Sequence, residues 1–268
     1  QAEKDAILEK AQESEESLKL YQQQETEAKV KVEKQKQERK KPIALEYNEA
    51  QTRQHLIDVD LKEAGWDNLT EGRELEYPVK GMPITADNPK GNGFVDYVLW
   101  DDDGKPLALI EAKGATKDLE VGKHQAFLYA NCLEQMHGQR PVIFYTNGYE
   151  TKLWDDQFYS TPRRVYGYYT KDELQWAIQR RATLKDLRKA TINKEIAGKG
   201  RPYQVEAIQR VAESFVTDSQ DGLRGAKRQA LLVMATGSGK TRTAAAIVDV
   251  LFKNNWVKRV LFLADRNA

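Results

Sequence analysis

Three side chains whose types and spacing suit joint chemistry, Asp96, Glu111 and Lys113, lie in a predicted strand pair apolar enough to be buried. Carboxylate oxygens are the ligands that Mg²⁺ prefers, and the ion keeps several waters of its own. An ion held by Asp96, Glu111 and the carbonyl oxygen of Ala112 would stabilise charge on a phosphate, and Lys113 would orient or activate the attacking water. The set is therefore suited to cleaving a phosphodiester bond.

The hairpin that must position this set consists of two apolar runs, 93–100 and 105–113, on either side of an acidic turn that ends in glycine. Such a pattern is typical of two antiparallel strands. Pairing the strands across the turn places Asp96 opposite Leu109 and diagonal to Glu111, with the lysine one step beyond. The pattern therefore predicts that the three charged side chains share one face.

A structural ion pair is the alternative interpretation of the same residues. Buried charges are costly unless they are paired or bound to a metal, and an Asp–Lys or Glu–Lys pair meets that demand as well as a cation does. Because 31% of the residues are charged, such a pattern also arises by chance. The triad by itself leaves both interpretations open.

The elements around the hairpin predict a mixed α/β domain over residues 42–170, in the order helix, strands, helix, strands. A variant capping box and a glycine stop predict the first helix over 48–64. Glu49 lies in its first turn, where it either favours the helix N-terminus, with Arg53 as its i+4 partner, or faces the metal site. Both interpretations stay open because periodicity does not orient the helix.

Later elements complete this domain. A helix is predicted over 119–137, ended by a glycine, with Gln125 and Tyr129 one turn apart on one face. The Asn-Gly pair that follows predicts a hairpin over 141–154. Residues 162–169 are aromatic and basic, and they either line a DNA groove by charge and stacking or form an amphipathic edge strand. Two charged helices, 171–181 and 183–196, are then expected to form a linker.

Composition limits the class of protein. The 268 residues leave room for more than one domain, and a net charge of +1 gives no global preference for an anionic partner. The single cysteine, Cys132, excludes an intramolecular disulfide framework and fits a reducing compartment. No run could span a membrane, and no signal peptide is found. Residues 1–41 predict a solvated charged helix or a weak coiled coil that ends at Pro42. The absence of an initial Met and the abrupt end suggest a fragment.

A second set of residues suited to chemistry lies near the end of the sequence. The pattern predicts a strand at 228–235, a glycine-rich loop, a helix at 244–252 and a second strand at 260–264. This is the context of a phosphate-binding loop, because backbone N–H groups and the helix N-terminus favour an anion. Lys240 would reach the β- and γ-phosphates of ATP, and Thr241 would hold Mg²⁺. The loop residues are Thr236, Gly237, Ser238, Gly239, Lys240 and Thr241.

The surroundings of this loop are less regular. Met234 stands where the full pattern has a glycine. Upstream, Arg201 and Gln204 lie at a predicted helix start, which is either only that, with a proline in its first turn, or an adenine clamp in which Gln204 reads the base edge. No acidic strand of the Walker B type follows, so we expect the chain to be incomplete for ATP hydrolysis.

The ordered set of motifs resembles the motor and nuclease (R) subunit of type I restriction enzymes over residues 43–268. The Asp96…Glu111-Ala112-Lys113 pattern looks like the core of the PD-(D/E)xK nuclease superfamily. The Gln125…Tyr129 pair looks like the helix that accompanies that core. Residues 49–66 are similar to the first helix of the family's nuclease domain.

The motor half of the resemblance rests on three further stretches. Arg201…Gln204 and residues 234–241 look like the Q motif and motif I of superfamily 2 helicases. Residues 260–267 resemble motif Ia of the type I subunits. The resemblance implies an α/β fold with four parts: a charged helical lead-in (1–41), a mixed-sheet PD-(D/E)xK nuclease domain (42–170), a helical linker (171–199) and the beginning of a RecA-like parallel α/β motor domain (200–268).

The resemblance also implies the activity, the cofactors and the partners. The activity would be Mg²⁺-dependent cleavage of double-stranded DNA coupled to ATP-driven translocation, for restriction of foreign DNA in the cytoplasm. The partners would be methyltransferase (M) and specificity (S) subunits, with S-adenosylmethionine used only by the methyltransferase and no membrane involved. The site residues would be Asp96, Glu111, Lys113, Gln125, Tyr129 and Glu49, with Ala112 contributing to the metal site.

Two other functions remain compatible with the residues. In the first, the chain is part of a different DNA-processing superfamily 2 helicase, whose N-terminal domain binds DNA or partners without cutting. In the second, it is part of a protein that only docks partners. The presence of a divalent cation between Asp96 and Glu111 would separate cutting from binding alone.

Overall fold

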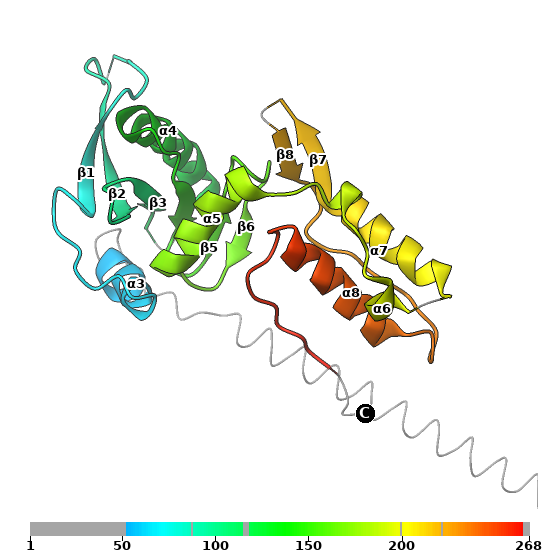
Figure 1. Cartoon of the computed structure of the whole chain (residues 1–268). Helices are drawn as coiled ribbons and strands as arrows, with labels where there is room; N and C mark the ends of the chain where they lie inside the picture. The colour runs from blue at the N-terminus through cyan, green and yellow to red at the C-terminus, as the bar shows by residue number, and fades with distance from the viewer. Residues whose placement is uncertain (1–51, 87, 115–117, 199, 221, 265–268) are drawn as a thin grey trace, which may run out of the picture. The chain divides into compact units, whose positions relative to one another are not determined.

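The computed structural model of the protein describes residues 52–86, 88–114, 118–198, 200–220 and 222–264 (Figure 1). All of them belong to one structural unit, residues 47–268. The predicted helix of residues 1–41 and the candidate site residue Glu49 lie outside the described residues.

Six strands form one mixed sheet, and they lie side by side in chain order. They are β1 (Leu75–Lys80), β2 (Asn92–Trp100), β3 (Pro106–Ala112), β4 (Val142–Thr146), β5 (Thr151–Trp154) and β6 (Arg163–Val165). Every neighbouring pair is antiparallel except β3 and β4, which are parallel. The predicted mixed α/β arrangement is therefore confirmed, including the two hairpins.

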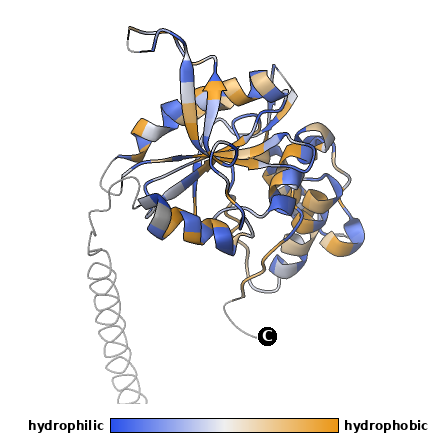
Figure 2. Cartoon of the chain, turned by 90° about the vertical axis from the view of Figure 1, so that its left-hand side faces the viewer, coloured by the Kyte–Doolittle hydropathy of each residue, from blue (hydrophilic) through white to orange (hydrophobic). Residues whose placement is uncertain are grey.

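Helices cover both faces of the sheet. On one face, α4 (Leu119–His137) connects the parallel strands β3 and β4 and packs in a core with residues of β2 and β3. On the other face, a second core takes side chains from η1 (Arg53–Ile57), α3 (Asp58–Glu63) and α5 (Lys171–Thr183). Figure 2 shows the sheet between these layers, with hydrophobic residues concentrated along its strands.

The bounds of α4 agree with the predicted helix 119–137, and its ends show why. The side chain of Asp118 accepts a hydrogen bond from the backbone N–H of Glu120, which satisfies a donor of the first turn. Gly138 adopts φ +70°, a left-handed conformation that ends the helix without a Cβ clash. Local sequence thus fixes both ends of the helix that carries Gln125 and Tyr129.

The register of the central hairpin differs from the prediction by two residues. Val98, rather than Asp96, lies opposite Leu109, and the ladder shifts at Leu99 and Trp100. The prediction paired Trp100 with Lys105, whereas in the structure Trp100 pairs with Pro106 and an irregularity in the ladder shifts the register beside it. Because the error is an even number of residues, every side chain keeps its predicted face.

The first described helix is less regular than expected from the predicted helix 48–64. The five residues of η1 form a π-helical turn, and α3 continues directly from it to Glu63. Gly65 follows with φ +86°, in agreement with the predicted stop. β6 pairs only with β5, so residues 162–169 contain the edge strand that was one of their two interpretations.

The predicted helix 183–196 is wrong. The structure has a 3₁₀ turn, η2 (Leu187–Lys189), and a single α-helical turn, α6 (Lys194–Ala197), separated by extended residues. The side chains of Asp186 and Asn193 each cap a new turn by accepting a backbone N–H, so the chain starts two helices where the pattern suggested one.

The predicted strands 228–235 and 260–264 are also wrong. Neither segment forms a strand, and Leu231 is 88% exposed while Leu261 is 82% exposed. A buried parallel strand needs neighbouring strands for its hydrogen bonds, and no described strand lies beside either segment. A third core includes residues of α7 (Pro202–Phe215) and α8 (Lys240–Lys253) but none of these two segments.

A small hairpin between these helices was not predicted. It consists of β7 (Val216–Ser219) and β8 (Gly222–Gly225), which form a two-stranded sheet of their own. No helix among the described residues combines the length and apolar character needed to cross a membrane.

Replacing Gly148 by Ala is expected to lower the free energy of unfolding by about 2–3 kcal/mol. Gly148 has φ +85°, and a Cβ there would lie 2.5 Å from Cδ1 of Leu56 and 2.7 Å from Cγ2 of Thr52. Chemical denaturation measures the effect. Gly104 is the matched control, since it has φ +76° in another hairpin turn but open space around it, so Gly104→Ala should cost only about 1 kcal/mol. Equal losses would contradict close packing of η1 on the β4–β5 turn.

Candidate functional site

Asp96 and Glu111 lie side by side on neighbouring strands. Continuing the β2–β3 register by one residue places Asp96 directly opposite Glu111, on the sheet face that α4 covers. Only 6% of Asp96 and 1% of Glu111 is exposed. Oδ2 of Asp96 accepts a hydrogen bond of 2.7 Å from the backbone N–H of Ala112. This bond ties the Asp96 carboxylate to the strand that carries Glu111.

Lys113 links this carboxylate pair to α4. Its Nζ donates to Oε1 of Glu111 at 2.5 Å and to Oε1 of Gln125 at 3.1 Å. Nε2 of Gln125 donates in turn to the hydroxyl of Tyr129 at 2.9 Å. Burial, followed by the charges of Glu111 and Asp96, raises the pKa of Tyr129, so its hydroxyl stays protonated at neutral pH. The structure therefore brings Asp96, Glu111, Lys113, Gln125 and Tyr129 into one connected polar cluster.

Arg53 also belongs to this cluster, although its only predicted role was that of a helical i+4 partner of Glu49. Its guanidinium forms ion pairs with Glu76 and, at 3.4 Å, with Asp96. Burial alone lowers the pKa of Arg53, but the hydrogen bond to Glu76 and the charge of Asp96 raise it above its ordinary value. These partners lie far away in the chain, so no local spacing could have identified the contact.

Gly122 of α4 is a second residue that sequence reasoning missed. A Cβ at this position would lie 3.3 Å from Cγ of Lys113 and 3.7 Å from Cγ of Glu111. The missing side chain lets the helix approach the charged pair closely. The available signal was a glycine inside an otherwise regular helix. Such a glycine lowers helix stability, so its presence indicates that close packing requires it.

The oxygen atoms around Asp96 and Glu111 are of the type that a hard divalent cation prefers. They belong to two carboxylates and the strand-end carbonyl of Ala112, and Mg²⁺ completes such sets with its own waters. Among the described residues, no group of three or more Asp, Glu, His or Cys side chains is placed to hold a metal ion. The residues present thus suit a lightly coordinated, hydrated Mg²⁺ rather than an ion enclosed by protein ligands.

The predicted phosphate loop lies directly before α8. Gly237 and Gly239 adopt φ +77° and +89°, the left-handed conformation that suits glycine. A Cβ on Gly239 would lie 2.2 Å from Nε2 of Gln204 and 3.0 Å from Nη1 of Arg201. The loop therefore folds closely against the start of α7, which carries both of these predicted nucleotide-binding residues.

Gln204 is attached to the loop by a hydrogen bond. It is fully buried, and its Nε2 donates to the carbonyl oxygen of Ser238 at 2.6 Å. Its Oε1 is buried and has no hydrogen-bond partner among the described residues. The amide thus holds the loop through its nitrogen, while its oxygen is a buried acceptor that no described donor meets.

The remaining loop residues face solvent. Thr236 is exposed, and so are Lys240 and Thr241 in the first turn of α8. Nζ of Lys240 lies 3.4 Å from the carbonyl oxygens of both Met234 and Ala235, so the side chain folds back over the loop. This position keeps its ammonium near the helix N-terminus, where an anion is favoured.

Comparisons with known families cover both parts of the chain. Residues 84–159 match the family model described as "Type I restriction enzyme R protein N terminus". Residues 197–268 match the model described as "Type III restriction enzyme, res subunit". The first match contains the cluster around Asp96 and Glu111, and the second contains the glycine-rich loop.

Curated relatives agree with these matches. The endonuclease subunit of the type I restriction enzyme EcoAI from Escherichia coli is 33% identical over 76% of this chain, and that of EcoKI from E. coli K12 is 26% identical over 84%. The chain spans about a quarter of the length of these relatives, 25% and 23%. A solved fragment of an HsdR subunit of a type I restriction enzyme from Vibrio vulnificus YJ016 matches 80% of this chain and 40% of its own, with 24% identity and a TM-score of 0.40.

Proposed function

Because this chain belongs to the family of type I restriction enzyme R subunits, we propose that its sheet region contains the centre of a Mg²⁺-dependent DNA endonuclease of the PD-(D/E)xK kind. The observation that carries the proposal is the convergence of Asp96, in the middle of β2, with Glu111 and Lys113 at the end of β3. Two carboxylates and one ammonium from separate strands are more than local folding requires.

In this proposal Asp96, Glu111 and the Ala112 carbonyl hold the cation. The bound Mg²⁺ would supply charge stabilisation on the scissile phosphate and polarise a water. Lys113 orients that water through its Nζ, which the Glu111 carboxylate and Gln125 hold in place. Tyr129 in turn positions Gln125, so a helix and a strand fix the lysine together.

The structural ion pair and the metal site are compatible states of the same residues. Without a cation, Lys113 and Arg53 lie against Glu111 and Asp96 and balance part of their charge. These ion pairs offset part of the desolvation cost of the two buried carboxylates before a cation and a DNA phosphate bind. The ion pairs therefore do not argue against catalysis.

Titration with Mn²⁺ in the absence of nucleotide tests the metal site in the full-length subunit. We expect Glu111→Gln to weaken Mn²⁺ binding at least about tenfold, because it removes one of two charged ligands. Asp102→Asn is the matched control, since this carboxylate lies in the exposed turn of the same hairpin. Equal affinity in wild type and Glu111→Gln would favour the alternative function, in which this region binds DNA without cutting.

For residues 200–268 we propose ATP binding in the first part of a translocating motor. Arg201 and Gln204 support the loop, and Thr236, Gly237, Ser238, Gly239, Lys240 and Thr241 would surround the phosphates. The Oε1 of Gln204 is a buried acceptor without a described donor, and it would accept from the amino group of adenine once a small movement of the loop exposed it. When bound, the nucleotide with its Mg²⁺ would supply the energy for movement along DNA.

Changing Lys240 to Ala in the full-length subunit should lower the affinity for ATP at least about tenfold, because the ammonium is the charge that meets the phosphates. Fluorescence titration with a labelled ATP measures the change. Lys253→Ala, at the exposed far end of the same helix, is the control and should leave affinity unchanged. If the two variants bind ATP equally well, Lys240 has no part in nucleotide binding.

The partners follow from the family and remain part of the proposal. The substrate would be double-stranded DNA, and the complex would include M and S subunits, with S-adenosylmethionine used by the M subunit alone. Restriction of foreign DNA would take place in the cytoplasm. Sedimentation of the full-length subunit with M and S subunits would test the assembly directly.

A further inference from the structure

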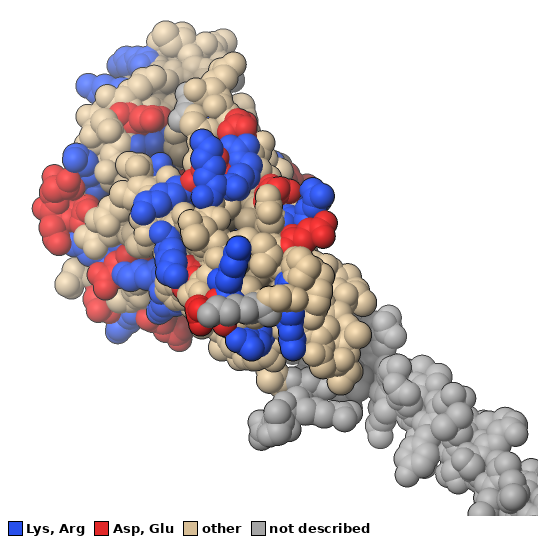
Figure 3. Space-filling view, turned by 45° about the vertical axis from the view of Figure 1, so that its right-hand side comes forward, with Lys and Arg blue, Asp and Glu red and all other residues tan. Residues whose placement is uncertain are grey.

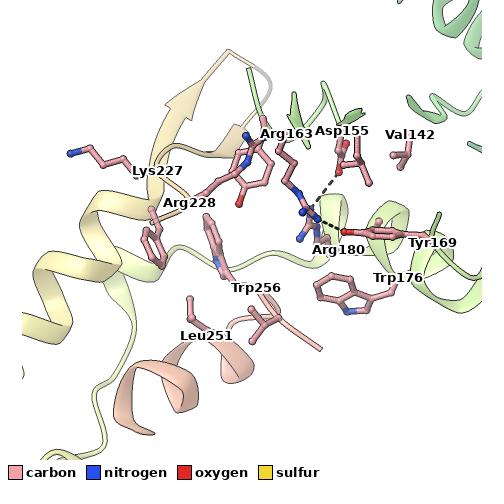
Figure 4. Close-up of a pocket in the computed structure, with 15 residues that line it drawn as sticks. Val142, Asp155, Arg163, Tyr169, Trp176, Arg180, Lys227, Arg228, Leu251 and Trp256 are labelled. Atoms are coloured by element: carbon pink, nitrogen blue, oxygen red, sulfur yellow. Dashed lines mark hydrogen bonds and ion pairs between the residues drawn. The ribbon is translucent and has the colours of Figure 1, made fainter. Parts of the chain in front are cut away.

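A cavity of about 430 Å³ lies between the edge of the sheet and the C-terminal helices (Figure 4). It is lined by the ends of β4 and β5, by α5, and by residues near α7 and α8. Val142, at the start of β4, contributes to its wall, whereas the partner of Ala112 is Thr146 at the end of that strand. Four residues separate these positions, about 13 Å along a strand, so the cavity is not part of the Asp96 cluster.

The cavity has an excess of positive charge. Arg163, Arg180, Lys227 and Arg228 line it, and Asp155 is its acidic residue. Asp155 is shared, because it pairs with Arg180 at 3.5 Å and with a neighbouring arginine outside the lining at 2.8 Å. Figure 4 shows the charged ends of Arg163 and Arg180 directed towards the middle of the cavity.

Arg228 lacks a carboxylate partner within the described part of the chain. Its guanidinium donates to the carbonyl oxygens of Thr161 and Pro162. Burial, together with the like charges of Arg163 and Arg180, lowers the pKa of Arg228. An anion in the cavity would offset both effects, because its charge favours the charged form of the arginine.

Aromatic rings supply the rest of the wall. Trp176 and Trp256 line the cavity with Tyr159 and Tyr169. The guanidinium carbon of Arg228 lies 4.0 Å from the ring centre of Tyr159, and that of Arg180 lies 5.0 Å from the ring centre of Trp176. Two of the guanidinium groups that line the cavity thus lie against aromatic rings of its wall.

A second hollow extends the positive surface outward. It shares Arg163, Trp176 and Arg180 with the cavity and adds Lys258 and Arg259. Glu173 pairs with Arg259 there. Figure 3 shows Lys and Arg side chains gathered on the middle of one face of the molecule. A chain-like anion could therefore continue from the cavity across the surface.

We propose that this cavity binds one nucleotide unit, with its phosphate on the arginines and its base against the aromatic rings. Guanidinium groups bind phosphate through paired hydrogen bonds, and base–aromatic stacking is independent of sequence. The volume lies within the range of small-ligand sites. An acidic peptide would satisfy the cations but leave the rings without a flat partner. The inference rests on the proposed function in one respect: DNA, the proposed substrate, would supply the nucleotide.

Photo-crosslinking to the full-length subunit tests the site without relying on cleavage. The probe is a twelve-nucleotide thymidine strand that contains 5-iododeoxyuridine, used without Mg²⁺ or ATP, and crosslinked peptides are identified by mass spectrometry. We expect crosslinks to peptides that contain Tyr159, Tyr169, Trp176 or Trp256. Arg163→Gln should reduce them at least tenfold. Arg164→Gln is the matched control, because this neighbour in β6 lies outside the cavity, over Tyr166.

Competition identifies the ligand. Displacement of the probe by thymidine monophosphate supports a free nucleotide as sufficient, and displacement only by longer strands supports a DNA segment. Displacement by inorganic phosphate as effective as by the nucleotide, or stronger displacement by polyglutamate, would overturn the inference. So would crosslinks that are absent from these peptides or equal in Arg163→Gln and wild type, provided that both melt at the same temperature. Measuring DNA cleavage by the same variants distinguishes failure of this inference from failure of the proposed endonuclease. Loss of the crosslinks with cleavage retained leaves the proposed endonuclease intact.

Discussion

Replacing Lys113 by Met, or Asp96 by Asn, in the full-length R subunit should slow DNA cleavage about 100- to 10,000-fold while DNA-stimulated ATP hydrolysis continues. Lys113 is the one ammonium in contact with both Glu111 and Gln125, so no described neighbour can replace it. Asp96 supplies one of the two charged oxygens proposed for the cation. Gel analysis of circular DNA, run beside an ATPase assay, measures both activities.

The control for these variants is Lys123→Met. Lys123 lies on α4, as Gln125 does, but it pairs with Glu120 at the surface. Its replacement should therefore leave the rate of DNA cleavage unchanged. Continued cutting by both Lys113→Met and Asp96→Asn would refute the proposed endonuclease centre. Loss of both cleavage and ATPase would point instead to a folding defect, which thermal denaturation separates from a catalytic one.

Replacing Arg140 by Met should lower the free energy of unfolding by about 3–5 kcal/mol, because it leaves a buried carboxylate without its countercharge. Nε of Arg140 donates to Asp156 at 2.9 Å, and Nη1 donates to Asn131 at 2.7 Å and to Glu134 at 2.9 Å. Asp156 is itself buried. The arginine therefore ties α4 to the segment after β5 through several directed bonds.

Denaturant unfolding of matched variants isolates the cause. The double variant Arg140→Met with Asp156→Leu should regain much of the loss, because it removes the unpaired charge as well. Lys253→Met, which breaks an exposed ion pair with Asp249 on α8, should cost less than about 0.5 kcal/mol. If Arg140→Met proved as mild as Lys253→Met, the buried pair would have no structural role.

The cluster around Asp96 also has a consequence for the proposed metal site. Arg53 and Lys113 form ion pairs with the two carboxylates, so a cation bound there would compete with them or share their oxygens. Binding of DNA would change this balance, because the phosphate adds negative charge beside the two basic side chains. We therefore expect the cation to bind more tightly in the presence of DNA than in its absence.

Local sequence determined the elements on which the site depends. Two apolar runs on either side of an acidic turn defined β2 and β3, and the strand period of two placed Asp96, Glu111 and Lys113 on one face even though the register was wrong by two residues. Asp118 and Gly138 defined the ends of α4, because capping is a property of neighbouring residues. The order of the motifs was sufficient to indicate the family.

Only the tertiary structure decided which distant groups meet. It brought Arg53 and Gly122 to the charged pair, and it formed the cavity between Arg163 and Arg228, because such contacts depend on packing rather than on spacing along the chain. It also showed the segments 228–235 and 260–264 to be unpaired. Their apolar runs favour a strand, but a strand is stable only where neighbouring strands accept its hydrogen bonds, and that condition cannot be read from the segment itself.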